Sequence, residues 1–185
     1  MRTTKFNREV FFAADEVVTV SRGDLDLVRD AADGSDRHRA RVCAHQNPED
    51  ALHEMIVVLK RNAYMIPDKH LVKVESYHVI EGVADVILYD ADGEITDVVR
   101  IGDYASGLPF YFRVRSPNFY HSLIIRSEAL VYHETATGPF RKSDTVIPPW
   151  APAETDDAGK TAYMREIERR VDEFLAGRVG AGASS

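Results

Sequence analysis

The feature that most constrains the fold is a succession of short apolar runs separated by turn residues. Residues 83–89 and 95–101 flank a turn at positions 90–93, which strongly indicates a β-hairpin. Residues 55–59 are continuously apolar, as is typical of a strand buried on both faces. Further strand-like runs lie at residues 10–12, 17–20, 62–66, 110–114, 122–125 and 130–133. This many short strands predicts an all-β sandwich or barrel.

Two helices are expected outside the strand-rich region. Ser21 or Asp24 caps a short helix that ends at residues 33–36. Near the C-terminus, Tyr163, Ile167 and Val171 repeat at helical spacing and predict an amphipathic helix, packed on the body of the protein or on a second subunit. No strand pattern is evident after residue 140. We therefore divide the chain into an N-terminal extension (1–38), a barrel (39–152), a C-terminal helix (153–176) and a flexible tail (177–185).

Length, charge and cysteine content restrict the class of protein. A chain of 185 residues suits one domain with a sizeable core. Its net charge of −7 argues against a general nucleic-acid binder, which needs a basic face. Cys43 is the only cysteine, so an internal disulfide is excluded and a reducing compartment fits. The polar N-terminal stretch and the lack of a membrane-length apolar run predict a cytoplasmic protein without membrane association.

A cluster of side chains able to bind a metal lies in residues 67–82. Asp68 and His70 are two positions apart, so an extended chain projects them to one face. If the chain turns and returns, Glu75 reaches the same point from the neighbouring strand. Carboxylate and imidazole donors together suit one divalent transition metal ion such as Fe, Mn, Ni, Co or Zn.

At these positions the chain resembles the cupin superfamily. His70, Glu75 and Gly82 fit the second His, the Glu and the Gly of the first cupin motif, whereas Asp68 stands where that motif has its first His. Residues 116–121 resemble the second motif, which leads through a turn to the lone His121. The resemblance implies a double-stranded β-helix, which is a jelly-roll-like barrel. It also implies a metal ion bound by His70, Glu75 and His121, with Asp68 either a fourth ligand or turned to solvent or Lys69.

The resemblance is most specific to the WbuC-type cupins, which are often found with surface-polysaccharide genes. It extends from Arg39 to Pro152 and adds landmarks outside the two motifs, namely Arg39, Arg41, His45, Glu134 and residues 149–152. Glu134, matched by the family, is the preferred acid/base residue, and His45 is a second catalytic candidate.

Two pairs of residues are candidates for substrate binding. Arg39 and Arg41 share a face on an extended segment and suit an anionic group, although a basic cluster of this kind is more often solvated loop charge. Tyr64 and Tyr77 can line a pocket, although aromatic side chains in a small barrel are more often core.

Three functional classes remain open from the sequence. The first is a metal-dependent isomerase, epimerase or lyase that acts on a small polar, anionic, sugar-like metabolite. The second is an Fe(II) oxygenase that uses the same ligands. The third is a non-catalytic module that binds a small molecule. A homodimer is expected in each case, because closed two-fold symmetry is the commonest assembly and cupins are often dimers.

Overall fold

The computed structural model describes residues 1–114 and 118–182, and their backbone is predominantly β. A seven-stranded sheet has the order β1-β2-β3-β4-β11-β6-β9, and a three-stranded sheet has the order β10-β7-β8. The strands of the large sheet are β1 (Thr3–Lys5), β2 (Val10–Ala13), β3 (Arg39–Cys43), β4 (Leu52–Lys60), β11 (Ala129–Thr137), β6 (Glu75–Glu81) and β9 (Tyr111–Val114). Those of the small sheet are β10 (Tyr120–Ile125), β7 (Val83–Tyr89) and β8 (Ile95–Gly102). A short ladder pairs β5 (Lys69–His70) with β12 (Thr145–Val146).

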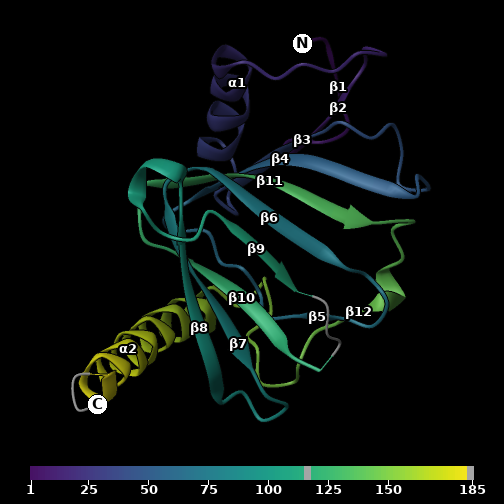
Figure 1. Cartoon of the computed structure of the whole chain (residues 1–185). Helices are drawn as coiled ribbons and strands as arrows, with labels where there is room; N and C mark the ends of the chain where they lie inside the picture. Colours follow the sequence, from purple (N-terminus) through teal and green to yellow (C-terminus); the bar gives the residue numbers. More distant parts are fainter. Residues whose placement is uncertain (115–117, 183–185) are drawn as a thin grey trace.

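The two sheets form a splayed pair of layers with a helix outside each (Figure 1). The main core fills the space between the sheets, and α1 (Arg22–Asp33) and α2 (Asp157–Gly182) each cover a second apolar cluster. β4 shows how one strand serves two clusters, because its side chains alternate. Val57 and Leu59 pack in the inter-sheet core, whereas Val58 packs under α1. The prediction that this strand is buried on both faces is confirmed.

The helix α1 begins at a capping box. The Ser21 side chain accepts a hydrogen bond from the Asp24 backbone, and the Asp24 carboxylate accepts one from the Ser21 backbone at 2.7 Å. These bonds satisfy backbone groups that have no partner within the helix. Val28 and Ala32, one turn apart, are fully buried against the large sheet. The expected position of this helix and its N-cap are confirmed.

The C-terminal helix uses its apolar stripe within its own chain. Ile167 and Val171 are buried, and they pack with Ile87 and Tyr89 of the small sheet. Of the two sites proposed for this stripe, the body of the protein is therefore the one observed. The helix continues to Gly182, past the boundary at residue 177 where the sequence predicts a tail. Residues 183–185 of that predicted tail lie outside the described part of the chain.

The structure differs from the sequence prediction in three segments. Residues 17–20 form no strand, and Val17 is 81% exposed to solvent instead of packing in a sheet. Residues 62–66 form no strand either, because Ala63 closes a turn by donating to the Lys60 carbonyl, and Tyr64 packs towards α2. A strand does follow residue 140, but β12 has only two residues, too few for any alternation to be visible.

Gly82 separates β6 from β7 in a conformation that other residues rarely adopt. Its φ is +90°, and a Cβ atom would lie 2.2 Å from the Ala129 carbonyl oxygen. The turn therefore requires glycine on both conformational and steric grounds. η1 (Tyr104–Ser106) and η2 (Lys142–Asp144) are short 3-10 helices in connecting loops. Within the described residues, no helix is both long and apolar enough to cross a membrane.

Candidate metal centre

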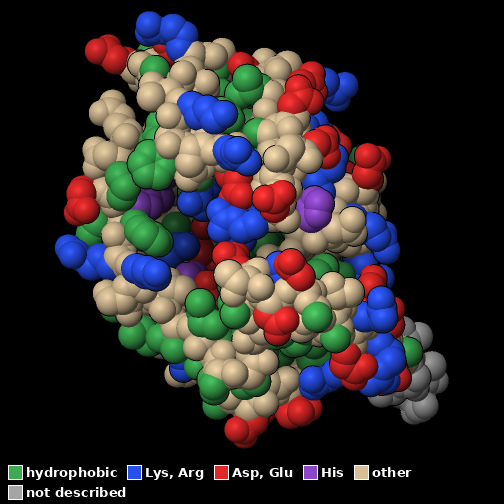
Figure 2. All heavy atoms as spheres, turned by 180° about the vertical axis from the view of Figure 1, so that it is seen from behind, with side chains coloured by type: hydrophobic (Ala, Val, Ile, Leu, Met, Phe, Trp, Pro, Cys, Tyr) green, Lys and Arg blue, Asp and Glu red, His purple; other side chains and the backbone are tan. Residues whose placement is uncertain are grey.

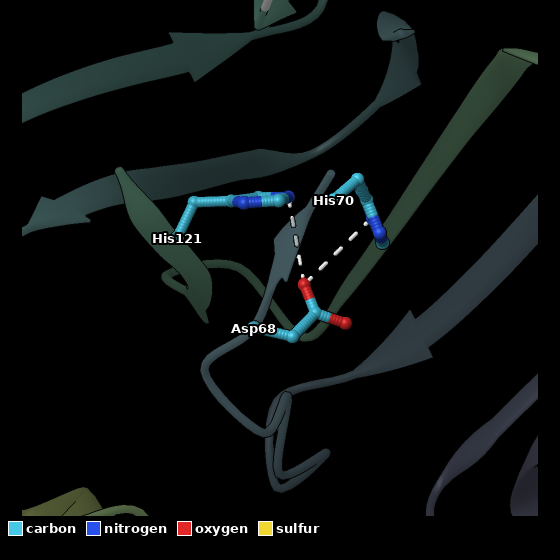
Figure 3. Close-up of side chains that lie close together, drawn as sticks. All are labelled: Asp68, His70 and His121. Atoms are coloured by element: carbon cyan, nitrogen blue, oxygen red, sulfur yellow. Dashed lines mark ion pairs between the residues drawn. The ribbon is translucent and has the colours of Figure 1, made fainter. Parts of the chain in front are cut away.

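Two segments that are far apart in the sequence meet where β5 and β10 approach each other. Asp68 precedes β5 and His70 lies on it, whereas His121 is the second residue of β10. The Asp68 backbone N–H donates to the His121 carbonyl at 3.1 Å, and the His121 N–H donates to the Asp68 carbonyl at 2.8 Å. This reciprocal bridge holds both segments in register. Figure 3 shows the Asp68 carboxylate pointing between the two imidazole rings.

The donor atoms of these three side chains are spaced as a single metal ion requires. Asp68 Oδ1 lies 3.8 Å from His70 Nε2 and 3.9 Å from His121 Nε2. Atoms bound to one such ion at about 2.0–2.2 Å are at most about 4.4 Å apart, so both separations fit a shared ion. The three donor atoms all lie within 4.8 Å of one another. The group Asp68, His70 and His121 can therefore hold a metal ion.

Glu75 adjoins the same histidines and is almost completely buried. Its Oε1 accepts from Tyr77 Oη at 2.6 Å and lies 2.6 Å from His121 Nε2. Its Oε2 lies 2.7 Å from Lys73 Nζ and 3.2 Å from His70 Nε2. Burial alone disfavours the carboxylate, but the two histidines and the lysine outweigh it and hold the pKa of Glu75 well below its usual range. Glu75 is therefore present as an anion.

Lys73 and Glu134 extend this cluster. Lys73 Nζ lies 3.4 Å from Glu134 Oε1 and therefore contacts two carboxylates. Burial lowers the pKa of Lys73, but the charges of Glu134 and Glu75 outweigh this, and the net pKa is raised. Burial raises the pKa of Glu134, and the charge of Lys73 opposes that shift. The site thus holds an acid/base side chain next to a cation that it shares with Glu75.

Lys73 is the site residue that the sequence analysis missed. The available signal was strand alternation, since Lys73, Glu75 and Tyr77 are two positions apart and share a face on an extended chain. Lysine has no place in the metal-ligand pattern, and its role becomes visible only when Glu134 lies opposite. Tyr77, for which the sequence left pocket lining and core packing open, is buried in the main core and donates its hydroxyl to Glu75.

The second nitrogens of the two histidines have different surroundings. His70 Nδ1 lies 3.2 Å from the Thr145 hydroxyl on β12. His121 Nδ1 is buried and has no hydrogen-bond partner among the described residues. Burial lowers the pKa of His121, but hydrogen bonding to Glu75 and the charges of Glu75 and Asp68 outweigh it and raise the pKa. A metal-binding histidine commonly donates its other ring nitrogen to a neighbouring acceptor, and the Thr145 hydroxyl lies in that position for His70.

The two arginines predicted to bind substrate differ in their contacts. Arg39 pairs with Glu154 at 2.9 Å, so part of its charge is already used. The Arg41 backbone N–H donates to the Glu9 carbonyl at 2.7 Å, but its guanidinium has no hydrogen bond or ion pair to any described residue. The charge of Arg41 lowers the pKa of Glu134. Viewed from behind, acidic, basic and histidine side chains gather around a hollow in the surface (Figure 2). Of the two arginines, Arg41 is therefore the one whose guanidinium can bind an anionic ligand without first breaking an ion pair.

The structure places two other predicted residues away from the metal cluster. The His45 ring stacks on His53 with ring centroids 4.2 Å apart, and its Nδ1 lies 3.1 Å from the Glu54 carbonyl. Within the described part of the chain it makes no hydrogen bond, ion pair or ring contact with Asp68, His70 or His121. Tyr64 donates its hydroxyl to the Pro152 carbonyl and lies edge-on to Tyr163 of α2. Residues 116 and 117 of the second motif lie outside the described residues.

Among known protein families, the sequence matches one whose function is unknown. A domain of unknown function, DUF6016, matches residues 15–101, just under half of the chain. This range contains Asp68, His70 and Glu75 but not His121. No curated protein matches the sequence.

Several solved structures are similar in fold at low sequence identity. Procruciferin, an 11S globulin from Brassica napus, has 17% identity and a TM-score of 0.39 over 48% of this chain and 21% of its own. The Cnp3 cupin domain from Schizosaccharomyces pombe has 14% identity and a TM-score of 0.42 over 55% and 66%. Bacillus subtilis oxalate decarboxylase has 19% identity and a TM-score of 0.44 over 59% and 27%. The chain thus spans from about a fifth to about two thirds of these proteins, and likeness at this level carries no argument about activity.

The fold class follows from the architecture itself. Two facing sheets that are antiparallel except for the parallel pair β2–β3, a short N-terminal helix and a C-terminal helix match the expected cupin-type barrel, and that prediction is confirmed. The structure also brings Asp68 and both histidines together at the place where the resemblance puts a metal ion. This is the architecture of a cupin-fold protein with a candidate metal site.

Proposed function

We propose that the chain is a metal-dependent enzyme acting on a small, polar, anionic metabolite, of the isomerase, epimerase or lyase type. The observation that carries this proposal is the convergence of Asp68, His70 and His121, with Glu75 beside both histidines. A divalent ion bound there would polarise a carbonyl or hydroxyl oxygen. Glu134, buried and next to Lys73, is placed to hold or release a proton near that group.

The charges around the site support an anionic ligand. Asp68, Glu75 and Glu134 carry three negative charges, and Lys73 and Arg41 carry two positive ones. With neutral histidines the sum is −1, and one divalent ion changes it to +1. Protonation of Glu134 makes the sum more positive still. A negatively charged metabolite therefore complements the metal-loaded site despite the overall charge of −7. The resemblance to WbuC-type cupins adds a sugar-like acid as the substrate class.

The metal proposal is tested by comparing the parent protein with His121→Ala, both purified without a His-tag. We expect elemental analysis to find one Fe, Mn, Ni, Co or Zn ion per chain in the parent and a large loss in the variant. Asp68→Ala is the second test, because retained affinity would show that Asp68 is not a ligand. Equal, substoichiometric metal in the parent and in His121→Ala would refute the site.

An Fe(II) oxygenase is the second candidate function, and the ligand set favours it. Two histidines and one carboxylate that leave open positions are typical of non-haem iron oxygenases. An oxygen electrode separates the two candidates. An oxygenase consumes oxygen when Fe(II)-loaded protein meets metabolite pools, whereas an isomerase or lyase turns over with Zn, Mn or Ni and consumes none. A non-catalytic binder turns nothing over with any of these ions.

We further propose that the protein is a homodimer. β9 stands at one end of the large sheet, and apolar side chains are exposed on it and on the neighbouring loop. Tyr111 is 53% exposed and Tyr104 is 82% exposed. An open strand edge with exposed aromatic groups is a surface that proteins commonly cover. A monomeric mass by light scattering at micromolar concentration would contradict this assembly.

A further inference from the structure

Lys73 is a cation built into a site that is suited to a second, stronger cation. Its ammonium lies 2.7 Å from Glu75 Oε2 and 3.4 Å from Glu134 Oε1, and its side chain is 24% exposed. We propose that Lys73 competes with the divalent ion for Glu75, and that metal binding transfers its ammonium to Glu134. This inference rests on the metal site proposed above.

The acceptor positions of Glu75 are the first step of the reasoning. An ionised carboxylate offers about four lone-pair positions, and Glu75 has four polar neighbours, namely Tyr77, His121, Lys73 and His70. All of its acceptor capacity is therefore engaged. An ion that takes a Glu75 oxygen must displace one of these neighbours or share an oxygen with it.

Lys73 is the neighbour that can leave. The two histidines contact Glu75 through the same Nε2 atoms that would bind the ion, so ion binding replaces these two contacts and leaves both rings at the site as ligands. The Tyr77 ring is buried on β6 between Phe112 and Tyr132. Lys73 instead lies on the irregular segment between β5 and β6, has a flexible side chain and already has a second carboxylate within reach. Its ammonium also repels the ion, as any two positive charges near one oxygen do.

The transfer has a consequence for the acid/base residue. In the structure the Lys73 ammonium contacts both Glu75 and Glu134, and its distance to Glu134 is the longer of the two. Once the ion has taken Glu75, the ammonium pairs with Glu134 alone and fixes its carboxylate. Metal loading and the positioning of Glu134 are then coupled through one side chain. Lys73 acts here as a positioning residue.

The test is the affinity of the protein for Zn²⁺ and Co²⁺, measured by competition with a chromophoric chelator. We expect Lys73→Met to bind both ions about 10- to 100-fold more tightly than the parent, the scale on which neighbours of metal ligands act. Lys73→Arg keeps the charge and is expected to stay close to the parent. Lys73→Gln gives the same neutral test if the methionine variant does not fold.

Lys69→Met is the matched control. Lys69 lies on β5 beside His70, and its ammonium sits 4.7 Å from the centroid of the Tyr120 ring. Within the described residues, Lys69 forms no ion pair with Glu75. Removing it deletes the same charge from the same segment without freeing Glu75. We expect its effect on metal affinity to be much smaller than that of Lys73→Met.

A double-mutant cycle isolates the transfer to Glu134. In Glu134→Gln the Lys73 ammonium has lost its second carboxylate and stays paired with Glu75. This variant is therefore expected to bind metal more weakly than the parent. In the Lys73→Met background the same substitution should have a clearly smaller effect, because no ammonium remains to be transferred.

Two results would overturn the inference. Unchanged or weaker metal binding in both neutral Lys73 variants would show that Lys73 orients Glu75 instead of competing for it. An equal effect of Glu134→Gln in both backgrounds would remove the transfer step. If the folded parent binds neither ion, the proposed metal site itself fails, which is a distinguishable result.

Discussion

Asp85 provides a sharp test of how the small sheet is held to the C-terminal helix. Its side chain is completely buried on β7, where Arg100 contacts both carboxylate oxygens at 2.7 and 3.0 Å. Arg126 contacts Oδ2 at 2.6 Å and also pairs with Glu168 and Asp172 of α2. The buried carboxylate thus organises two arginines, one of which reaches the helix. The perturbation that we consider is Asp85→Ala.

The magnitude follows from what the substitution leaves behind. Removing one partner of a buried ion pair typically costs about 3–5 kcal/mol, because the remaining charge is left uncompensated. Arg100 is 42% exposed and can turn to water, and Arg126 keeps its two acidic partners on α2. We therefore expect the lower end, about 3 kcal/mol of unfolding free energy. For a chain of this size, this lowers the melting temperature by about 6–12 °C.

The measurement is urea unfolding and thermal melting by circular dichroism, with Asp97→Ala as the control. Asp97 pairs with Arg178 at 2.7 Å and so also joins the small sheet to α2, but both side chains are substantially exposed. An exposed pair contributes under about 1 kcal/mol. A loss of under about 1 kcal/mol in Asp85→Ala, equal to that in Asp97→Ala, would refute the reasoning that burial makes this pair important.

Three further predictions concern other parts of the molecule. Burial raises the pKa of the Cys43 thiol to about 11, so a disulfide reagent at pH 8 should react with Cys43 only after unfolding. Because the pKa is higher in the folded state, the free energy of unfolding should also decrease as pH rises from about 9 to 11. Ile167→Ala should cost about 2–5 kcal/mol in urea unfolding, because the side chain is buried between α2 and the small sheet; a cost under about 1 kcal/mol would show that this contact is dispensable. Arg41→Lys should abolish binding of small carboxylates to the metal-loaded protein in calorimetric titrations, whereas Arg39→Lys should retain it, because Arg39 is already paired with Glu154; unchanged binding in both variants would exclude an arginine anchor.

Local patterns in the sequence were sufficient wherever neighbouring residues decide the structure. The β7–β8 hairpin, the Ser21 cap and the buried strand β4 were all predicted, because turn chemistry, capping and apolar runs act within a few residues. The same reasoning failed at residues 17–20 and 62–66. Whether the apolar residues there join a strand depends on the surface that the rest of the chain provides for them, which local composition does not reveal.

The candidate metal ligands were also within reach of the sequence, since Asp68, His70 and Glu75 lie at short spacing and the resemblance to the second cupin motif adds His121. Their convergence was not, because only the bridge between Asp68 and His121 brings residues 53 positions apart into contact. Lys73 and Arg39 show the limit most clearly. The sequence presents both as ordinary cations, whereas the fold places one between Glu75 and Glu134 and pairs the other with Glu154. The strength and partners of a charge depend on burial and on distances across the fold, and these are set by tertiary packing.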